Sequence, residues 1–271
     1  MHKKINHYEI VDRLNAGGTA TIFSGVDLQT GELVAIKQLN PAFFANATML
    51  QSFRKEAYRY LELKHPNIVS LKDFILYKDT GYLVMEYIDG KNLREYIKEI
   101  SGPLPISNVA LLMMETMAAL GFAHSQNIVH LDIKPSNIML TEKNQIKLID
   151  FGISSEGKKN AGEEIMGSPY YMSPEQIKGE DVDHRTDIYS LGISIYELLT
   201  GRLPFDGDLT RDQLFDKIKT QPVPDYYAPN ELDIEYEGEM NEIIQRATAK
   251  SPDDRYEDCE EFTMDLLQFL N

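Results

Sequence analysis

The sequence predicts an α+β protein of two lobes, a small antiparallel β-rich lobe with one key helix and a larger, mainly helical lobe. Short runs of alternating apolar and polar residues fill residues 8–39, and the breakers Gly17-Gly18 and Thr30-Gly31 separate them, which is typical of an antiparallel sheet. After Asn92 the apolar residues recur at helical spacing instead. The pattern changes near residues 86–90, and we expect the two lobes to join there.

The small lobe is expected to hold five strands and one helix. Apolar residues at helical spacing from Phe53 to Leu61 indicate the helix, which should end before the breaker His65-Pro66-Asn67. Two strands should follow it and finish near Met85. The three strands expected before the helix cover residues 8–14, 21–26 and 33–39.

The large lobe is expected to be mostly helical. A helix over residues 108–124 carries an apolar stripe that includes Met113 and Met117, and we expect these methionines to lie in the core. A short β-rich segment, residues 138–149, should interrupt the helices. The other helices are expected over residues 187–200, 209–220, 240–249 and 259–270.

Length and charge limit what the chain can be. The 271 residues fit one domain, residues 1–271, with a small lobe over 1–85, a hinge over 86–90 and a large lobe over 91–271. The net charge of −16 argues against a nucleic-acid or anionic-membrane partner, because such partners attract positive proteins.

Cysteine content and hydropathy favour a cytoplasmic protein. Cys259 is the only cysteine, so an intrachain disulfide is ruled out and a reducing compartment suits the chain. A membrane helix needs about 18 consecutive apolar residues, and we find no such run. We therefore expect no membrane contact within this chain.

Lys37 is a candidate functional cation. It lies in the apolar run Val34-Ala35-Ile36-Lys37, where an unpaired ammonium would be costly to desolvate. Glu56 shares the apolar face of the expected helix and needs a cation for the same reason. Pairing the two resolves both problems. A purely stabilising ion pair is the alternative, but the segments around Asp132 and Asp150 favour a functional role.

Two segments, each with one aspartate, carry the strongest chemical signal. The segment from His130 to Asn137 places Asp132, Lys134 and an amide in one loop, and Asp150-Phe151-Gly152 follows a β-like run. Oxygen ligands from Asn137 and Asp150 suit magnesium, which leaves Asp132 to face a hydroxyl. A glycine-containing turn over residues 14–23 would let backbone N–H groups approach phosphate oxygens, although by itself it is more simply a hairpin turn.

These residues, in this order, resemble the signature set of protein kinases. The resemblance covers nearly the whole chain and is closest to the bacterial eukaryotic-like Ser/Thr protein kinase catalytic domain. Three further segments support that subgroup: His65-Pro66-Asn67-Ile68-Val69, Met172-Ser173-Pro174-Glu175-Gln176 and Asp187-Ile188-Tyr189-Ser190-Leu191-Gly192.

The resemblance implies a bilobal kinase fold and transfer of the γ-phosphoryl of ATP to a serine or threonine hydroxyl of a protein. It implies Mg²⁺, or Mn²⁺ in its place, held by Asn137 and Asp150. The catalytic residues it implies are Asp132, Lys134, Asn137, Lys37 and Glu56. The residues it assigns to ATP are Leu14, Asn15, Ala16, Gly17, Gly18, Thr19, Ala20, Ile22, Ala35, Lys37, Met85, Glu86, Ile88 and Met139.

The resemblance also implies several structural roles. Tyr60, Leu71, His130 and Phe151 are expected to stack as an internal hydrophobic column, with His130 as a packing residue and not a base. In the large lobe, Glu175 is expected to pair with Arg255, and Asp187 with the backbone near His130. Ser168 and Lys134 are the residues that the family uses for Ser/Thr substrates.

The chain departs from the family pattern at two places. Asn15 and Ala20 replace the first and third glycines of the phosphate loop, and ATP binding is expected to survive this. Leu131 replaces the arginine that anchors a phosphorylated activation loop, and the segment 150–175 contains no threonine. We therefore predict activity without activation-loop phosphorylation.

Two other functions remain open. A nucleotide-binding pseudokinase that acts as an interaction module is the main alternative, but Lys37, Asp132, Asn137 and Asp150 are all present. A small-molecule phosphotransferase of kinase-like fold is disfavoured by the intact segment around Ser173-Pro174-Glu175, an argument from resemblance. The sequence does not predict the physiological substrate or the oligomeric state.

Overall fold

The computed structural model describes residues 4–16, 20–40, 47–77, 80–100, 102–151, 169–229, 231 and 233–270. Within this part of the chain the residues form two compact units, and the chain passes from the first to the second between Asp89 and Gly90. That point lies within the segment 86–90, where the sequence pattern changes.

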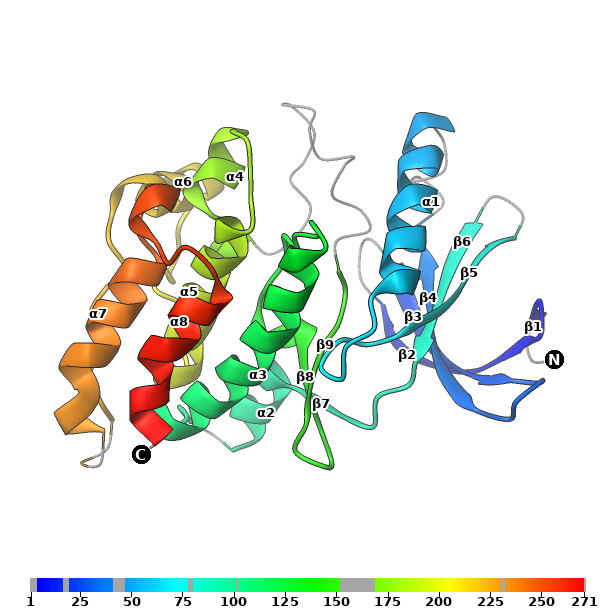
Figure 1. The fold of residues 1–271 in the computed structure, drawn as a ribbon, viewed down its shortest axis with the longest axis horizontal. Coiled ribbons are helices and arrows are strands. Elements are labelled where there is room, and N and C mark those ends of the chain that lie inside the picture. The colour runs from blue at the N-terminus through cyan, green and yellow to red at the C-terminus, as the bar shows by residue number, and fades with distance from the viewer. Residues whose placement is uncertain are drawn as a thin grey trace. The chain divides into compact units, whose positions relative to one another are not determined.

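The first unit is a six-stranded antiparallel sheet with one described helix. The strand order is β1-β2-β3-β4-β6-β5, and every neighbouring pair is antiparallel. The elements are β1 (Lys4–Ile5), β2 (Tyr8–Ala16), β3 (Ala20–Asp27), β4 (Leu33–Leu39), α1 (Ala47–Glu62), β5 (Leu71–Tyr77) and β6 (Thr80–Glu86) (Figure 1). The five predicted strands and the helix are present. β1 was missed because two residues are too short to show an alternation.

An apolar cluster covers one face of this sheet. Val34 and Ile36 alternate with half-buried residues along β4, as expected for a strand whose two faces differ. α1 packs against β5, and its residues Ala57 and Tyr60 are buried. The cluster comprises Ile5, Tyr8, Ile10, Val34, Ile36, Tyr82 and Val84.

The second unit is mainly helical and carries a small three-stranded sheet, β7-β8-β9. Its strands are β7 (Gly90–Asn92), β8 (Ile138–Thr141) and β9 (Ile146–Leu148). Its helices are α2 (Leu93–Glu99), α3 (Ile106–Ser125), α4 (Pro174–Lys178), α5 (Arg185–Thr200), α6 (Arg211–Thr220), α7 (Glu237–Ala247) and α8 (Cys259–Leu266). Short 3₁₀ turns cover Pro135–Asn137, Pro169–Tyr171, Ile234–Tyr236, Pro252–Asp254 and Leu267–Leu270.

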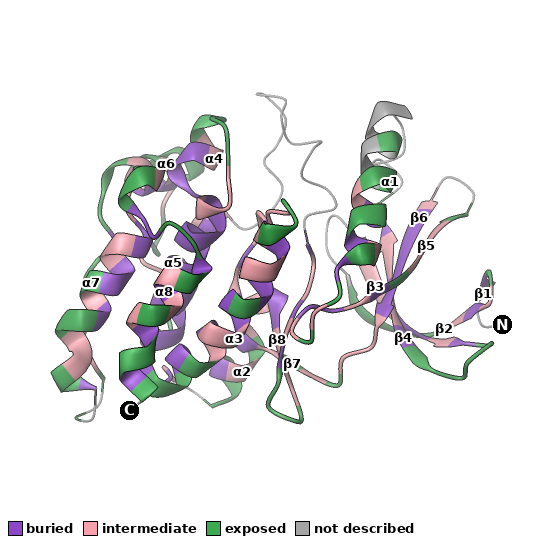
Figure 2. Ribbon diagram, viewed as in Figure 1, coloured by how far each residue is buried: buried purple, intermediate pink, exposed green. Residues whose placement is uncertain are grey.

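Helix α5 is the core of the second unit. Every residue from Thr186 to Leu199 is buried, and α3 and α7 pack against it (Figure 2). Gly192 permits the contact with α7, because a Cβ there would lie only 2.7 Å from the Thr248 Cγ2 atom and 2.9 Å from the Ala247 Cβ atom. A helix without polar residues exposed on any side is typical of a domain core.

The predicted burial of two methionines on helix α3 is confirmed. Met113 and Met117 are buried, and α3 packs against both α5 and α8. α3 also has the length and apolar composition of a membrane span, and half of that apolar stretch is buried among the other elements. A core helix meets the same criteria of length and composition.

Several predicted helix boundaries were wrong by two or more residues. α1 begins at Ala47, before the predicted pattern from Phe53, and α3, α5 and α6 begin at Ile106, Arg185 and Arg211 rather than at residues 108, 187 and 209. α7 begins at Glu237, three residues earlier than predicted, because acidic residues in a first turn favour a helix N-terminus but add nothing to the apolar periodicity. The helix predicted over 259–270 is α8 followed by a 3₁₀ turn from Leu267.

Candidate functional site

In the first unit, strand register brings several of the predicted ATP-binding residues onto one face of the sheet. Lys37 on β4 lies opposite Ile22 on β3, and Ala35 on β4 lies opposite Met85 on β6. Directly opposed residues point to the same face, and so do residues two apart on one strand. The four side chains therefore lie on one face of the sheet, and Val34 and Ile36 lie on the other. Ile22, Ala35 and Met85 thus share a face with the Lys37 ammonium and are not part of the apolar cluster.

The end of β6 is held against the segment before β5. The Glu86 N–H donates to the Ser70 carbonyl at 2.9 Å, and the Ser70 N–H donates to the Glu86 carboxylate at 3.1 Å. Ile88 follows in an irregular, half-buried segment of the same unit. These bonds fix the chain just before it leaves the first unit.

Other predicted residues of the first unit are only partly described. Asn15 on β2 lies opposite Ile22 on β3, and Leu14 is 49% exposed. Residues 17–19 of the glycine turn lie outside the described residues, while Ala16 and Ala20 end β2 and begin β3. Glu56 is half-buried on α1, and its pairing with Lys37 stays a prediction.

In the second unit, the loop after α3 brings three predicted catalytic side chains together. The Lys134 ammonium lies 2.8 Å from an Asp132 carboxylate oxygen, and the Asn137 amide donates to the same oxygen at 3.0 Å. Asn137 also donates to the Asp132 carbonyl at 2.8 Å. Asp132 is thus held by an ammonium and an amide, and its side chain remains 36% exposed.

The buried carboxylate of Asp187 on α5 fixes the backbone of this loop. It accepts hydrogen bonds from the N–H of His130 at 2.7 Å and of Leu131 at 2.8 Å. His124 Nε2 lies 2.8 Å from the same carboxylate. The predicted contact between Asp187 and the backbone near His130 is present, and it holds Leu131 at a φ of 66°, a left-handed conformation that costs a branched residue energy.

His130 packs in the core, as predicted. Its Nδ1 atom accepts from the Asp132 N–H at 3.3 Å, so Nε2 carries the proton and donates to the Ile149 carbonyl at 2.9 Å. Burial lowers the pKa of the imidazole, and the ring lies against Phe151 with centroids 4.7 Å apart. Both ring nitrogens are used, and the side chain is unsuited to act as a base.

Asp150 follows β9 in the same unit, with a left-handed φ of 61°. The Ile149 N–H donates to the Asn137 carbonyl at 2.9 Å, which links the start of this segment to the loop that holds Asp132. Asn137 spends its N–H₂ group on Asp132, so its side-chain oxygen is the atom that suits a hard cation. Met139, two residues after Asn137, lies on β8 opposite Lys147 of β9.

The comparison with family models decides the class of protein. The protein kinase domain matches residues 8–267. This chain belongs to the protein kinase family.

Known proteins agree with this assignment. A probable serine/threonine-protein kinase of Clostridium acetobutylicum is 36% identical over 269 residues, covering 98% of this chain and 40% of the relative. Serine/threonine-protein kinase PrkC of Bacillus subtilis is 36% identical over 263 residues, covering 96% of this chain and 40% of the relative. The chain thus spans about two-fifths of the length of these curated relatives.

A solved structure supports the fold. The crystal structure of the PknI kinase domain of Mycobacterium tuberculosis matches with a TM-score of 0.78 at 25% identity, covering 99% of this chain and 98% of that chain. The predicted resemblance to a bacterial-type Ser/Thr kinase catalytic domain and the predicted two-lobed α+β fold are confirmed.

An ion pair anchors helix α4 of this kinase domain. Both guanidinium ends of Arg255 donate to the Glu175 carboxylate, at 2.7 and 2.8 Å, and the Thr186 hydroxyl donates to it at 2.7 Å. Burial by itself would raise the pKa of Glu175, but Arg255 and Thr186 outweigh it and lower that pKa. The predicted pairing of Glu175 with Arg255 is present.

A second buried carboxylate was missed by the sequence analysis. Glu197 on α5 accepts a short hydrogen bond from the Tyr171 hydroxyl, and Arg94 on α2 lies 3.3 Å away. Burial and the nearby Glu197 carboxylate raise the pKa of Tyr171. Composition and spacing gave no signal for a contact among these three residues, which lie on separate segments of the sequence.

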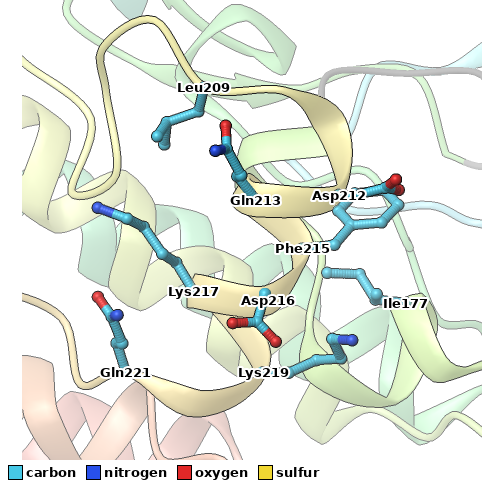
Figure 3. Close-up of a pocket in the computed structure, with 9 residues that line it drawn as sticks. All are labelled: Ile177, Leu209, Asp212, Gln213, Phe215, Asp216, Lys217, Lys219 and Gln221. Carbon is cyan, nitrogen blue, oxygen red and sulfur yellow. The ribbon is translucent and has the colours of Figure 1, made fainter.

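A cavity of about 700 Å³ lies beside α6 and the end of α4, and none of the predicted site residues that the structure describes lines it (Figure 3). Its lining mixes opposite charges, with Asp212 and Asp216 beside Lys217 and Lys219. The cavity is separate from the loop that carries Asp132.

Substitution of Glu175 tests the buried pair. Glu175→Gln removes the charge that compensates the buried guanidinium of Arg255, and we expect the free energy of unfolding at pH 7 to fall by about 3–5 kcal/mol. The folded-state pKa of Glu175 lies below its ordinary value of 4.5, so this contribution is complete above that value and is lost as the pH falls through the folded pKa. Urea unfolding measured from pH 7 down to about pH 2.5 checks both points, because the loss lies below the ordinary carboxyl pKa.

The control is Asp253→Asn, which removes an exposed partner of Arg185 that is 84% accessible. We expect a loss of at most about 1 kcal/mol from it. Equal losses from the two variants would contradict the account of the buried pair.

Proposed function

We propose that this chain is the catalytic domain of a serine/threonine protein kinase that transfers the γ-phosphoryl of Mg²⁺-bound ATP to a protein hydroxyl. The arrangement of Asp132, Lys134 and Asn137 in one loop carries the proposal. The Ser/Thr kinase names of the relatives support it, although the chain covers only part of their length. The single buried cysteine fits a cytoplasmic site of action.

The roles follow from the chemistry of the side chains. The substrate hydroxyl oxygen attacks the γ-phosphorus, the bond from phosphorus to the β-phosphate oxygen breaks, and Asp132 takes the hydroxyl proton. Lys134 offsets charge on the transferred group. This reaction depends on positioning and on charge stabilisation, which fixed cations and amides supply.

The family resemblance assigns the nucleotide to residues of the shared sheet face, Ile22, Ala35, Lys37 and Met85, and it also assigns Met139 to the adenine. Lys37 would contact the α- and β-phosphates, Glu56 would hold Lys37, and Ile22 and Ala35 would pack on the adenine. Asn137 and Asp150 would hold the metal ion, which offsets the negative charge of the phosphates when bound. Mn²⁺ could replace Mg²⁺ with the same oxygen ligands.

Loss of the carboxylate tests the reaction. Asp132→Asn keeps the size of the side chain but cannot accept the proton, and a positioned base contributes about 10²–10⁴-fold. We expect a loss of kcat of that order with labelled ATP, magnesium and a generic protein substrate, and nearly unchanged nucleotide binding.

Asp253→Asn serves as the control in this assay, because Asp253 is an exposed partner of Arg185. A wild-type protein that binds nucleotide but turns over no faster than Asp132→Asn would instead support the pseudokinase alternative, which the altered glycine turn at Asn15 and Ala20 keeps open.

Phosphatase treatment tests the proposed independence from activation-loop phosphorylation. Leu131 offers no cation to a loop phosphate, and its backbone is fixed by Asp187 instead. We expect treated and untreated protein to have kcat values within about twofold of each other, a judgement that rests on the missing Arg–phosphate pair. Loss of most turnover after treatment would refute the proposal.

A further inference from the structure

The side chain of Gln176 links helix α4 to the loop that holds Asp132. Its Nε2 atom donates to the Leu131 carbonyl at 3.2 Å. Its Oε1 atom accepts from the Ser173 N–H at 2.9 Å, within the capping box that begins α4. Leu131 and Gln176 are 45 residues apart in the sequence, so this bond connects two distant segments of the second unit.

The bond falls on the peptide unit that directly precedes the Asp132 Cα atom. The carbonyl of this unit, from Leu131, accepts from Gln176, and its N–H, from Asp132, donates to His130 Nδ1 at 3.3 Å. Both polar groups of the peptide are therefore held by side chains. A peptide fixed at both groups resists rotation, and its orientation sets the direction of the Asp132 side chain.

The two partners also fix the orientation of the Gln176 amide. An N–H donor lies on one side and a carbonyl acceptor on the other, so the oxygen must face Ser173 and the nitrogen must face Leu131. A carboxylate in this position could keep the first bond but would place an acceptor against the carbonyl. An amide is thus the group that this position requires.

The helix that carries Gln176 is anchored firmly enough to transmit this constraint. The adjacent Glu175 is bound by Arg255 and Thr186, and Ser173 is fully buried. The C-terminus of α4 closes on Gly179 with a φ of 70°. The amide therefore projects from a fixed helical turn toward the loop.

We propose that Gln176 is a positioning residue that aims the Asp132 carboxylate by holding the Leu131–Asp132 peptide, an inference that rests on the proposed function. The bond requires no phosphate. It ties α4, which follows the activation loop in the sequence, to the loop of Asp132. In this chain Leu131 replaces the arginine that would bind a phosphate on the activation loop. Gln176 does not touch the substrate.

Helix α6 offers a matched control. It begins with a capping box of the same design, in which the Thr210 N–H donates to Gln213 Oε1 at 2.9 Å and the Gln213 N–H donates to Thr210 Oγ1 at 3.3 Å. Gln213 lines the cavity beside α6 (Figure 3), and Asp132 is not among the residues that line this cavity. Gln213→Glu therefore makes the same chemical change at the same helix position as Gln176→Glu, without the contact to Leu131.

The two variants separate capping from positioning. We expect Gln176→Glu to lower kcat by about 10- to 100-fold, the size expected for a misplaced catalytic group, with KM for ATP changed by less than about twofold. Hydrogen–deuterium exchange of the segment 130–134 should become faster. Gln213→Glu should leave kcat and this exchange unchanged. A negative charge in a first turn is favourable in each helix, but Gln176→Glu should melt at a lower temperature than Gln213→Glu, because it alone loses a hydrogen bond to a carbonyl.

A further variant, Gln176→Met, removes both the bond to Leu131 and the capping bond from Ser173 without adding charge. Its matched control is Gln213→Met, which removes only a capping bond, and this pair decides the matter should Gln176→Glu fail to fold. Faster exchange over 130–134 with a lower kcat in either Gln176 variant, and neither change in Gln213→Glu, supports the proposal. Unchanged exchange and kcat in both folded Gln176 variants, or equal losses in Gln213→Glu, overturn it. Exchange is measured without substrate, so a wild-type protein that lacks kinase activity would refute the proposed function and still leave this test of Gln176 readable.

Discussion

The buried carboxylate of Asp187 holds in place the loop on which the proposed chemistry depends. It is fully inaccessible to solvent and accepts from the consecutive N–H groups of His130 and Leu131. Leaving buried donors unpaired costs about 1–3 kcal/mol each, so these bonds stabilise a loop that would otherwise relax. They also offset the left-handed backbone at Leu131, immediately before Asp132.

Helix α5 is the common support for both the catalytic loop and the segment that ends in α4. Besides Asp187, its Thr186 hydroxyl donates to Glu175, and its Ser190 hydroxyl donates to the Tyr171 carbonyl at 2.8 Å. About two turns beyond Ser190, Glu197 accepts from the Tyr171 hydroxyl. A buried helix thus presents its few polar side chains to the two segments that a phosphoryl-transfer site needs to fix. This explains why polar residues occur in so apolar a helix.

Part of the site could be predicted because an acid, a base and an amide occur together in one short segment. That reasoning led to the cluster of Asp132, Lys134 and Asn137, and it gains support from the bonds among them. The family resemblance added the buried pair of Glu175 and Arg255. The pairing of Lys37 with Glu56 rests on a different rule, that charges in apolar surroundings require partners, and it stays a prediction.

The contacts that sequence could not reveal are made by ordinary polar residues. Gln176 and Tyr171 become important only because the fold places a carbonyl or a carboxylate opposite them, and neither burial nor spacing shows this in the sequence. Boundaries failed for a related reason, since the start of α7 at Glu237 is set by capping charge and not by apolar periodicity. Backbone conformation was equally hidden, because nothing in the sequence indicates the left-handed φ of Leu131.

Amide exchange at His130 and Leu131, compared between the wild-type protein and Asp187→Asn, tests the central role of the buried carboxylate. The asparagine preserves size but turns one acceptor into a donor, so one of the two N–H groups loses its bond. The account predicts that exchange of these amides becomes at least about tenfold faster in the folded variant, since a bond worth roughly 1.4 kcal/mol or more is lost. Unchanged exchange at both amides in a folded Asp187→Asn protein would contradict it.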